Sequence, residues 1–225
     1  MRSAKSTGRI VGLLLLAQFL GLMFGFILLV PITKPEFLQT TAAIASQIRL
    51  AVLFLFAAGA VTIGIAIYAF PFFREHSPRM ALWLVALSII WFSLQAVDNQ
   101  HILSMMSLSQ QYAEGTVSAE VAQAAATAVR STRRWAHYTE LLVMDVWFFL
   151  LYATLFRFAI VPRVLAGFAL ALVAIHVAAV PLPAFIGYRQ LMVLAYSLLL
   201  SYALMCGWLL AKGFANSGLN ASRVV

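Results

Sequence analysis

Six apolar blocks constrain the fold of this chain more than any other feature of its sequence. A helix needs about 20 predominantly apolar residues to cross the hydrocarbon core of a bilayer, and each block is close to that length or longer. None of them alternates apolar and polar residues in the way that a strand of a membrane barrel does. The pattern therefore predicts six membrane-spanning helices, at residues 10–30, 50–70, 81–105, 138–158, 164–180 and 191–210.

The composition identifies lipid as the solvent of this chain. Hydrophobic residues make up 64% of the sequence and charged residues only 10%, whereas a soluble domain is roughly half apolar and a quarter charged. The formal net charge of +8 comes from Lys and Arg residues scattered between the apolar blocks. They form no stripe that could follow the phosphates of a nucleic acid. We therefore expect membrane lipid, and not nucleic acid, as a partner.

The pattern predicts one all-α integral membrane domain over residues 1–225, without a repeat or a second domain. A proline lacks the N–H group that a continuing helix needs. Pro31, Pro71 and Pro162 each follow an apolar block, and Pro181 with Pro183 closes the fifth, so they predict helix ends. The single cysteine, Cys206, excludes an internal disulfide and a multi-cysteine metal cluster.

The connection between the third and fourth blocks is the longest, and it contains SAEVAQAAATAVRSTRRW at residues 118–135. Alanine is the best helix former, and Ser118 belongs to the residue types that cap helix N-termini. We therefore expect an extra external helix between the third and fourth spans, which feeds into the fourth span.

The distribution of basic residues predicts the orientation in the membrane, because cytoplasmic loops carry an excess of Lys and Arg. We place the N-terminus, the turns near residues 71–80 and 157–163, and the C-terminus on one side. That side holds nine of the fifteen basic residues, namely Arg2, Lys5, Arg9, Arg74, Arg79, Arg157, Arg163, Lys212 and Arg223. The excess predicts that both termini lie in the cytoplasm.

Ionisable residues in or next to the spans concentrate in the half that this orientation places outside. A charged group near the bilayer centre costs on the order of 3 kcal/mol, so such groups usually face the bundle interior or a water-filled cavity. The sequence therefore predicts a polar pocket that opens outward and is closed below by apolar residues. Its residues are Asp98, His101, His137, Glu140, Asp145, His176 and Arg189.

Three functions fit such a pocket. The first is binding, sensing or passage of a small or lipid-like molecule, with His137 and Glu140 at the mouth. Asp98 and His101 would lie opposite, and Asp145 with His176 would form the floor. The alternative is a metal-dependent membrane enzyme in which a carboxylate acts as general base. The third is a structural or regulatory subunit whose polar residues only link helices. Whether the protein is an enzyme stays open, and no catalytic residue is assigned.

Histidine spacing does not single out a metal or a cofactor. Zinc in a catalytic site takes three protein ligands and a water, and His101, His137 and His176 are the candidates to supply them together with a carboxylate. No two histidines share a helix face at the spacing of the HExxH motif. Haem, with its iron bound by two histidines on facing helices, is the other cofactor that these residues could hold.

Three places in the sequence, at residues 8–16, at His137 and at residues 160–170, resemble a known family of bacterial membrane proteins, the domain of unknown function 4386 (DUF4386). The opening GRIVGLLLL at residues 8–16 is similar to the start of that family's first helix. His137 stands where the family's fourth span begins with a histidine. IVPRVLAGFAL at residues 160–170 is similar to the family's turn into its fifth span, with Ala166 at the usual first glycine.

The resemblance implies six helices with a long third connection, in a multi-pass protein of the bacterial inner (cytoplasmic) membrane. Only His137, Pro162 and Arg163 carry over, and the last two imply a turn and a cytoplasmic anchor. His101, His176 and Asp98 are not part of the family pattern. The resemblance therefore concerns the fold and implies no reaction.

Overall fold

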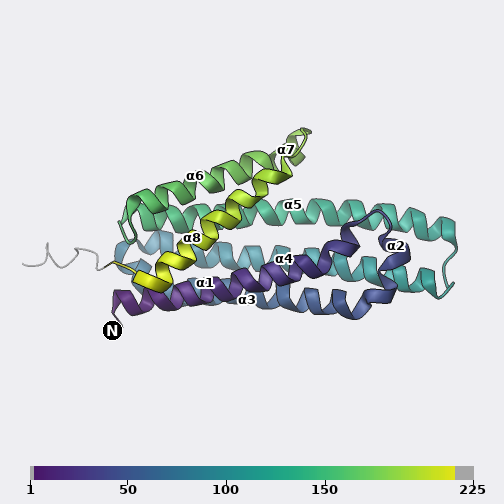
Figure 1. Ribbon diagram of the computed structural model, residues 1–225, viewed down its shortest axis with the longest axis horizontal. Helices are drawn as coiled ribbons and strands as arrows, with labels where there is room; N and C mark the ends of the chain where they lie inside the picture. The colour runs from purple at the N-terminus through teal and green to yellow at the C-terminus, as the bar shows by residue number, and fades with distance from the viewer. Residues whose placement is uncertain (1–2, 216–225) are drawn as a thin grey trace, which may run out of the picture. The chain divides into compact units, whose positions relative to one another are not determined.

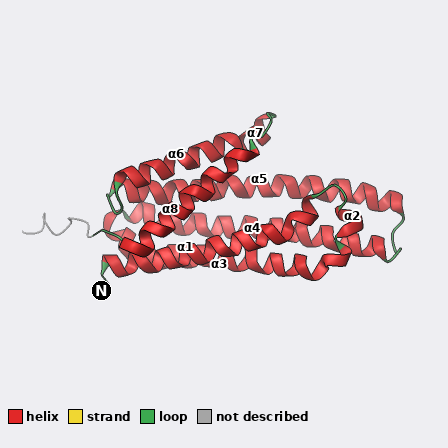
Figure 2. Ribbon diagram, in the orientation of Figure 1, coloured by secondary structure: helices red, strands yellow, loops and turns green. Residues whose placement is uncertain are grey.

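The computed structural model describes residues 3–215, and every regular element in that range is helical (Figures 1 and 2). Arg2 and Arg223, which entered the count of basic residues, lie outside the described range. The α-helices are α1 (Ala4–Leu29), α2 (Phe37–Thr40), α3 (Ala45–His76), α4 (Pro78–Ala113), α5 (Ala119–Arg157), α6 (Arg163–Ala179), α7 (Pro181–Ile186) and α8 (Tyr196–Lys212). Short 3-10 turns occur at η1 (Val30–Thr33), η2 (Ala42–Ile44) and η3 (Met192–Ala195).

Six helical segments among the described residues are long and apolar enough to cross a membrane. Many large apolar side chains are exposed, and Leu53, Trp83 and Val164 are 65%, 60% and 86% exposed. Such exposure is expected where lipid replaces water around the protein. The prediction of an all-α protein with six spans is confirmed, and the chain is a multi-pass membrane protein. The segments are Ala4–Thr33, Ala42–His76, Pro78–Ala113, Ala119–Arg157, Arg163–Ile186 and Met192–Lys212.

Prolines mark helix boundaries at three of the four predicted places. Pro31 lies in η1 after α1, Pro162 directly precedes α6, and Pro181 opens α7. The prediction for Pro71 is wrong, because α3 continues through it to His76. Spanning helices tolerate proline when other groups satisfy the carbonyl that it frees, and the Pro71 side chain itself is exposed.

The alanine-rich segment is helical, as predicted. It is not a separate element, because α5 runs without a break from Ala119 to Arg157 and contains the fourth span. The backbone N–H of Val121 donates to the Ser118 hydroxyl at 3.4 Å. This bond confirms Ser118 as the N-cap, since it satisfies one of the N–H groups that a helix start leaves unpaired.

The helices form two compact units. Unit 1 comprises the described residues of Met1–Ala17, Val61–Ile90 and Leu141–Val225, and unit 2 comprises Gln18–Ala60 and Trp91–Glu140. Each of the long helices α1, α3, α4 and α5 contributes residues to both units. The division therefore does not test the prediction of a single membrane domain, which stays a prediction.

In unit 1 the start of α1 packs against the end of α8 (Figure 1). Gly8 of α1 leaves room for the backbone of Gly213 and Phe214, which a Cβ at this position would strike. Gly213 has a φ of 71°, a backbone conformation that glycine adopts without strain. The guanidinium of Arg9 donates to the carbonyl of Ala211 at 3.0 Å. Farther along, α6 packs beside α8.

Unit 2 is built around an apolar core that α1, η1, α2, α3, α4 and α5 share. Ser109 connects α4 to α2 and η2, because its hydroxyl donates to the Leu38 carbonyl at 2.8 Å and accepts from the Ala42 N–H at 2.8 Å. Gly21 and Gly25 of α1 lie against α3, where Ala58 and Leu55 would contact an added Cβ. The largest fully buried members of this core are Phe37, Leu29, Ile32, Ile48 and Leu55.

Replacing Gly8 by alanine tests the approach of α1 to the segment after α8. The added Cβ would meet backbone atoms, which cannot rotate away, and overpacking of this kind costs about 1–3 kcal/mol. We expect a lower midpoint of thermal unfolding in detergent, measured by circular dichroism. Gly64→Ala is the matched control, because no atom lies within 4 Å of the Cβ it adds and alanine favours the helix. Equal midpoints for the two variants would contradict the packing described.

Candidate functional site

Unit 2 contains a group of buried polar side chains on α4 and α5. Gln95, Asp98, Asn99 and Glu140 are 2%, 2%, 1% and 4% exposed. The first three occupy one face of α4, because residues three and four apart lie on the same side of a helix. The two carboxylates need partners at this depth, since an isolated buried charge is strongly unfavourable.

The imidazole of His137 lies between the two carboxylates. Its Nδ1 is 3.6 Å from Asp98 Oδ2 and 3.7 Å from Glu140 Oε2. The other oxygen of each carboxylate faces a different donor. Asp98 Oδ1 is 3.4 Å from Arg133 Nε, and Glu140 Oε1 accepts a hydrogen bond from the Trp91 indole N–H at 3.2 Å.

Arg133 is the residue of this group that the sequence analysis missed. The count of basic residues leaves Arg133 outside the predicted cytoplasmic side, and the predicted pocket contains Arg189 instead. The available signal was spacing, because Arg133 precedes His137 by four residues on α5 and so shares its face. Arg189 is exposed, in the segment between α7 and η3.

A cavity of about 580 Å³ opens beside this group in unit 2. Its size falls within the range of small-molecule sites, which is roughly 300–1,000 Å³. The guanidinium groups of Arg130, Arg133 and Arg134 and the imidazole of His137 line it. Hydroxyl groups of Thr127, Ser131 and Tyr138 and the apolar side chains of Ile32 and Met105 complete most of the wall.

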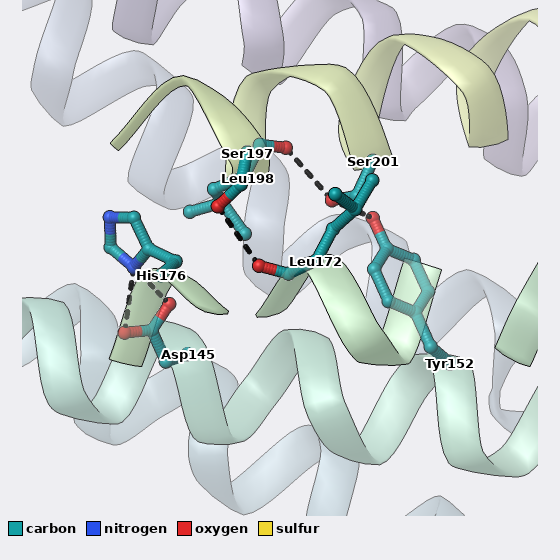
Figure 3. A network of polar contacts seen from close by, with 7 residues as sticks. All are labelled: Asp145, Tyr152, Leu172, His176, Ser197, Leu198 and Ser201. Carbon is teal, nitrogen blue, oxygen red and sulfur yellow. Dashed lines mark hydrogen bonds and ion pairs between the residues drawn. The ribbon is translucent and has the colours of Figure 1, made fainter. Parts of the chain in front are cut away.

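Unit 1 contains a separate polar pair, Asp145 of α5 and His176 of α6 (Figure 3). His176 Nδ1 lies 2.8 Å and 3.0 Å from the two oxygens of Asp145. The residues are 1% and 4% exposed, so the pair is almost completely buried. Each group is the other's partner, which makes the pair a direct link between the two helices.

Further polar contacts in Figure 3 connect α5 and α6 to α8. The Ser197 hydroxyl donates to the Leu172 carbonyl at 3.0 Å. The hydroxyls of Tyr152 and Ser201 lie 3.4 Å apart, and Ser201 donates to the Leu198 carbonyl at 2.8 Å. A smaller cavity of about 260 Å³ in this unit is lined by Asp145 and otherwise by apolar residues. These contacts suit helix association more than ligand recognition.

The structure thus places the predicted site residues in different surroundings. Asp98, His137 and Glu140 come together in unit 2, and Asp145 with His176 forms a pair in unit 1. His101 is half-buried on α4 and does not belong to the group whose ligand atoms converge. The ligand-binding roles assigned to these residues from the sequence stay predictions.

Paired substitutions test whether Asp145 and His176 act as one helix link. We expect Asp145→Asn and His176→Gln each to lower the midpoint of thermal unfolding, because each leaves a buried polar group with a weaker partner. The double variant should lose less than the sum of the single losses, with a coupling energy of about 1 kcal/mol, as for hydrogen bonds within membranes.

Glu114→Gln serves as the control, because it makes the same chemical change at an exposed carboxylate. Strictly additive losses in the Asp145 and His176 variants would contradict the direct contact.

The model of the family described as Domain of unknown function (DUF4386) matches residues 10–213. The match includes His137 and the turn at residues 160–170, which carried the resemblance in the sequence. No curated protein and no solved structure matches the chain. Because the family model covers nearly all of its 225 residues, the chain belongs to the DUF4386 family.

Proposed function

We propose that the unit 2 cavity binds the acidic group of a small, lipid-like molecule. The observation that carries this proposal is the presence of three arginines on one cavity wall, Arg130, Arg133 and Arg134. A guanidinium group presents several N–H donors in a planar fork that matches a carboxylate or phosphate. A wall with several such groups favours an anion over a neutral or cationic ligand.

Contacts with the protein hold these arginines in place and leave some of their guanidinium N–H donors available for a ligand. Arg130 Nη2 donates to the Thr33 carbonyl at 3.3 Å. Arg133 lies against Asp98 through Nε, and Arg134 lies over the Trp135 ring at 5.7 Å. Each contact occupies part of one guanidinium group. The remaining N–H donors supply the hydrogen bonds that recognise an acidic group.

The surroundings of the cavity favour an amphiphile over a free ion. Ile32 and Met105 give the wall an apolar part, and α5 belongs to a candidate span. Tyr138 is a cavity residue of a type that is enriched where a membrane meets water. A molecule with an acidic head and an apolar chain satisfies both parts of the wall.

The excess of basic residues on the predicted cytoplasmic side supports an outward-facing cavity. With that orientation, the cavity takes its ligand from the outer leaflet of the bacterial inner membrane. The proposed activity is binding, with sensing or passage of the ligand as its use. Cysteine-labelling at Thr127 and at Arg79 with a membrane-impermeant reagent distinguishes the two orientations, after Cys206 is replaced by alanine.

The proposal predicts that the double variant Arg130→Gln/Arg134→Gln loses affinity for acidic amphiphiles. Each charge-assisted hydrogen bond contributes about 1.5–3 kcal/mol, so affinity should fall by roughly 100-fold or more. Binding of a fluorescent fatty acid and of a short-chain phosphatidic acid to purified protein in neutral detergent measures the loss. The double variant Arg157→Gln/Arg163→Gln is the matched control, because both of its arginines are exposed and belong to unit 1.

Competition separates the sources of the acidic group. Displacement by phosphatidic acid but not by inorganic phosphate supports an amphiphile. Displacement by inorganic phosphate alone would overturn the amphiphile as the ligand and indicate a small anion instead. Equal binding of zwitterionic phosphatidylcholine, or unchanged affinity in the Arg130 and Arg134 variant, would overturn the proposal.

A further inference from the structure

The side chains of Asp98, His137 and Glu140 in unit 2 are more widely spaced than a hydrogen-bonded network requires. His137 Nδ1 stands 3.6 Å and 3.7 Å from its two carboxylate oxygens. It is a buried atom without a hydrogen-bond partner among the described residues. The Asp145–His176 pair shows the direct contact of the same chemical groups, at 2.8 Å. Because of this wider spacing, His137 Nδ1 faces one oxygen of Asp98 and one of Glu140 without a hydrogen bond to either.

We infer that Asp98, His137 and Glu140 bind a divalent transition-metal ion. One ligand atom from each residue lies within 4.8 Å of the others. Two ligands on a tetrahedral ion with bonds of about 2.0–2.1 Å stand about 3.4 Å apart. The spacings of His137 Nδ1 to the two carboxylates are close to this value, so a small rotation of the side chains would complete the site.

The donor set indicates which class of ion fits. One imidazole and two carboxylates suit zinc or manganese, whereas calcium and magnesium prefer oxygen ligands throughout. Two carboxylates also balance the charge of a divalent ion, which matters at a depth where Asp98 and Glu140 are 2% and 4% exposed. Three protein ligands leave a coordination position open for water or for a ligand.

The contacts around the three residues orient them in the way that metal ligands are oriented. The Trp91 indole N–H donates to Glu140 Oε1, and Arg133 Nε lies against Asp98 Oδ1. Each donor engages one oxygen and leaves the other oxygen toward His137 Nδ1. A hydrogen bond to a ligating carboxylate, such as that from Trp91 to Glu140, fixes ligand direction at metal centres and is important for affinity.

Two neighbouring side-chain amides give an independent indication that a polar species binds here. The side chains of Gln95 and Asn99 are 2% and 1% exposed, and neither forms a hydrogen bond among residues 3–215. Buried polar groups in proteins almost always have a partner, either protein, water or an ion. Both residues share the α4 face of Asp98. A hydrated ion at Asp98 supplies water molecules that such amides can bind.

The cavity of unit 2 reaches one of the three residues, His137. The His137 side chain is 24% exposed, and the residue lines the 580 Å³ cavity. The cavity therefore brings an ion to the His137 ring, beside the two buried carboxylates. The inference rests on the spacing of Asp98, His137 and Glu140 and does not depend on the proposed anion binding.

The test uses full-length protein purified in neutral detergent without a polyhistidine tag. After treatment with a chelator, zinc and manganese are titrated by calorimetry, and the bound metal is measured by elemental mass spectrometry. We expect about one ion per chain, with affinity reduced at least about 10-fold in His137→Ala, Asp98→Asn and Glu140→Gln. His101→Ala is the matched control, because this histidine is on α4 near Asp98 but outside the converging group.

Cobalt provides a spectroscopic check that does not depend on affinity alone. A cobalt-loaded site with one nitrogen and two oxygen ligands should give visible absorption bands that disappear in Glu140→Gln while the circular dichroism stays unchanged. The inference is overturned if wild-type protein binds no zinc or manganese after reloading. It is also overturned if the three ligand variants bind metal as wild type does, or if His101→Ala loses binding equally.

The same measurements separate this site from the anion site. Arg130→Gln/Arg134→Gln should keep full metal binding, because neither arginine contacts the three ligands. Loss of acidic-amphiphile binding with unchanged metal binding would leave the metal inference intact, and the reverse result would leave the anion proposal intact. Failure of one is therefore not failure of the other.

Discussion

Hydrocarbon solvates neither a charge nor an unpaired backbone group, and this constraint underlies both the fold and the polar chemistry of the protein. In the described residues the backbone satisfies it by forming helices, which leave large apolar side chains such as Leu53 and Val164 on the surface. The side chains satisfy it by pairing. Each buried carboxylate has a donor close by, with Asp98 facing Arg133, Glu140 facing Trp91 and Asp145 facing His176.

Pairing of the same chemical groups leads to two different arrangements. Asp145 and His176 are in direct contact at 2.8 Å through Nδ1 of the imidazole, and the pair joins two helices. His137 instead stands back from both of its carboxylates, at 3.6 Å and 3.7 Å. Two groups that are hydrogen-bonded to each other leave no space for an ion between them. The wider spacing around His137 leaves that space. The difference in spacing, and not the kind of residue, separates a structural link from a candidate binding site.

The DUF4386 family, whose model matches residues 10–213, is described as a domain of unknown function, so membership names no reaction. Function therefore has to be argued from the site itself. In unit 2 the wall that we propose to bind an anion includes Arg133 and His137, and both residues also lie close to Asp98. A cation held by Asp98, His137 and Glu140 would increase the positive charge that the cavity presents to an acidic ligand.

The sequence by itself determined the number of spans, the helical nature of the alanine-rich segment and the Ser118 cap. All of these depend on local properties, namely apolar length, helix propensity and helical periodicity. Only the tertiary structure decided that Arg133 reaches Asp98, that His176 pairs with Asp145, and that α3 continues through Pro71. The pairings depend on how each helix is rotated about its axis toward its neighbours. Hydropathy does not encode that rotation, because the side facing lipid and the side facing protein are both apolar.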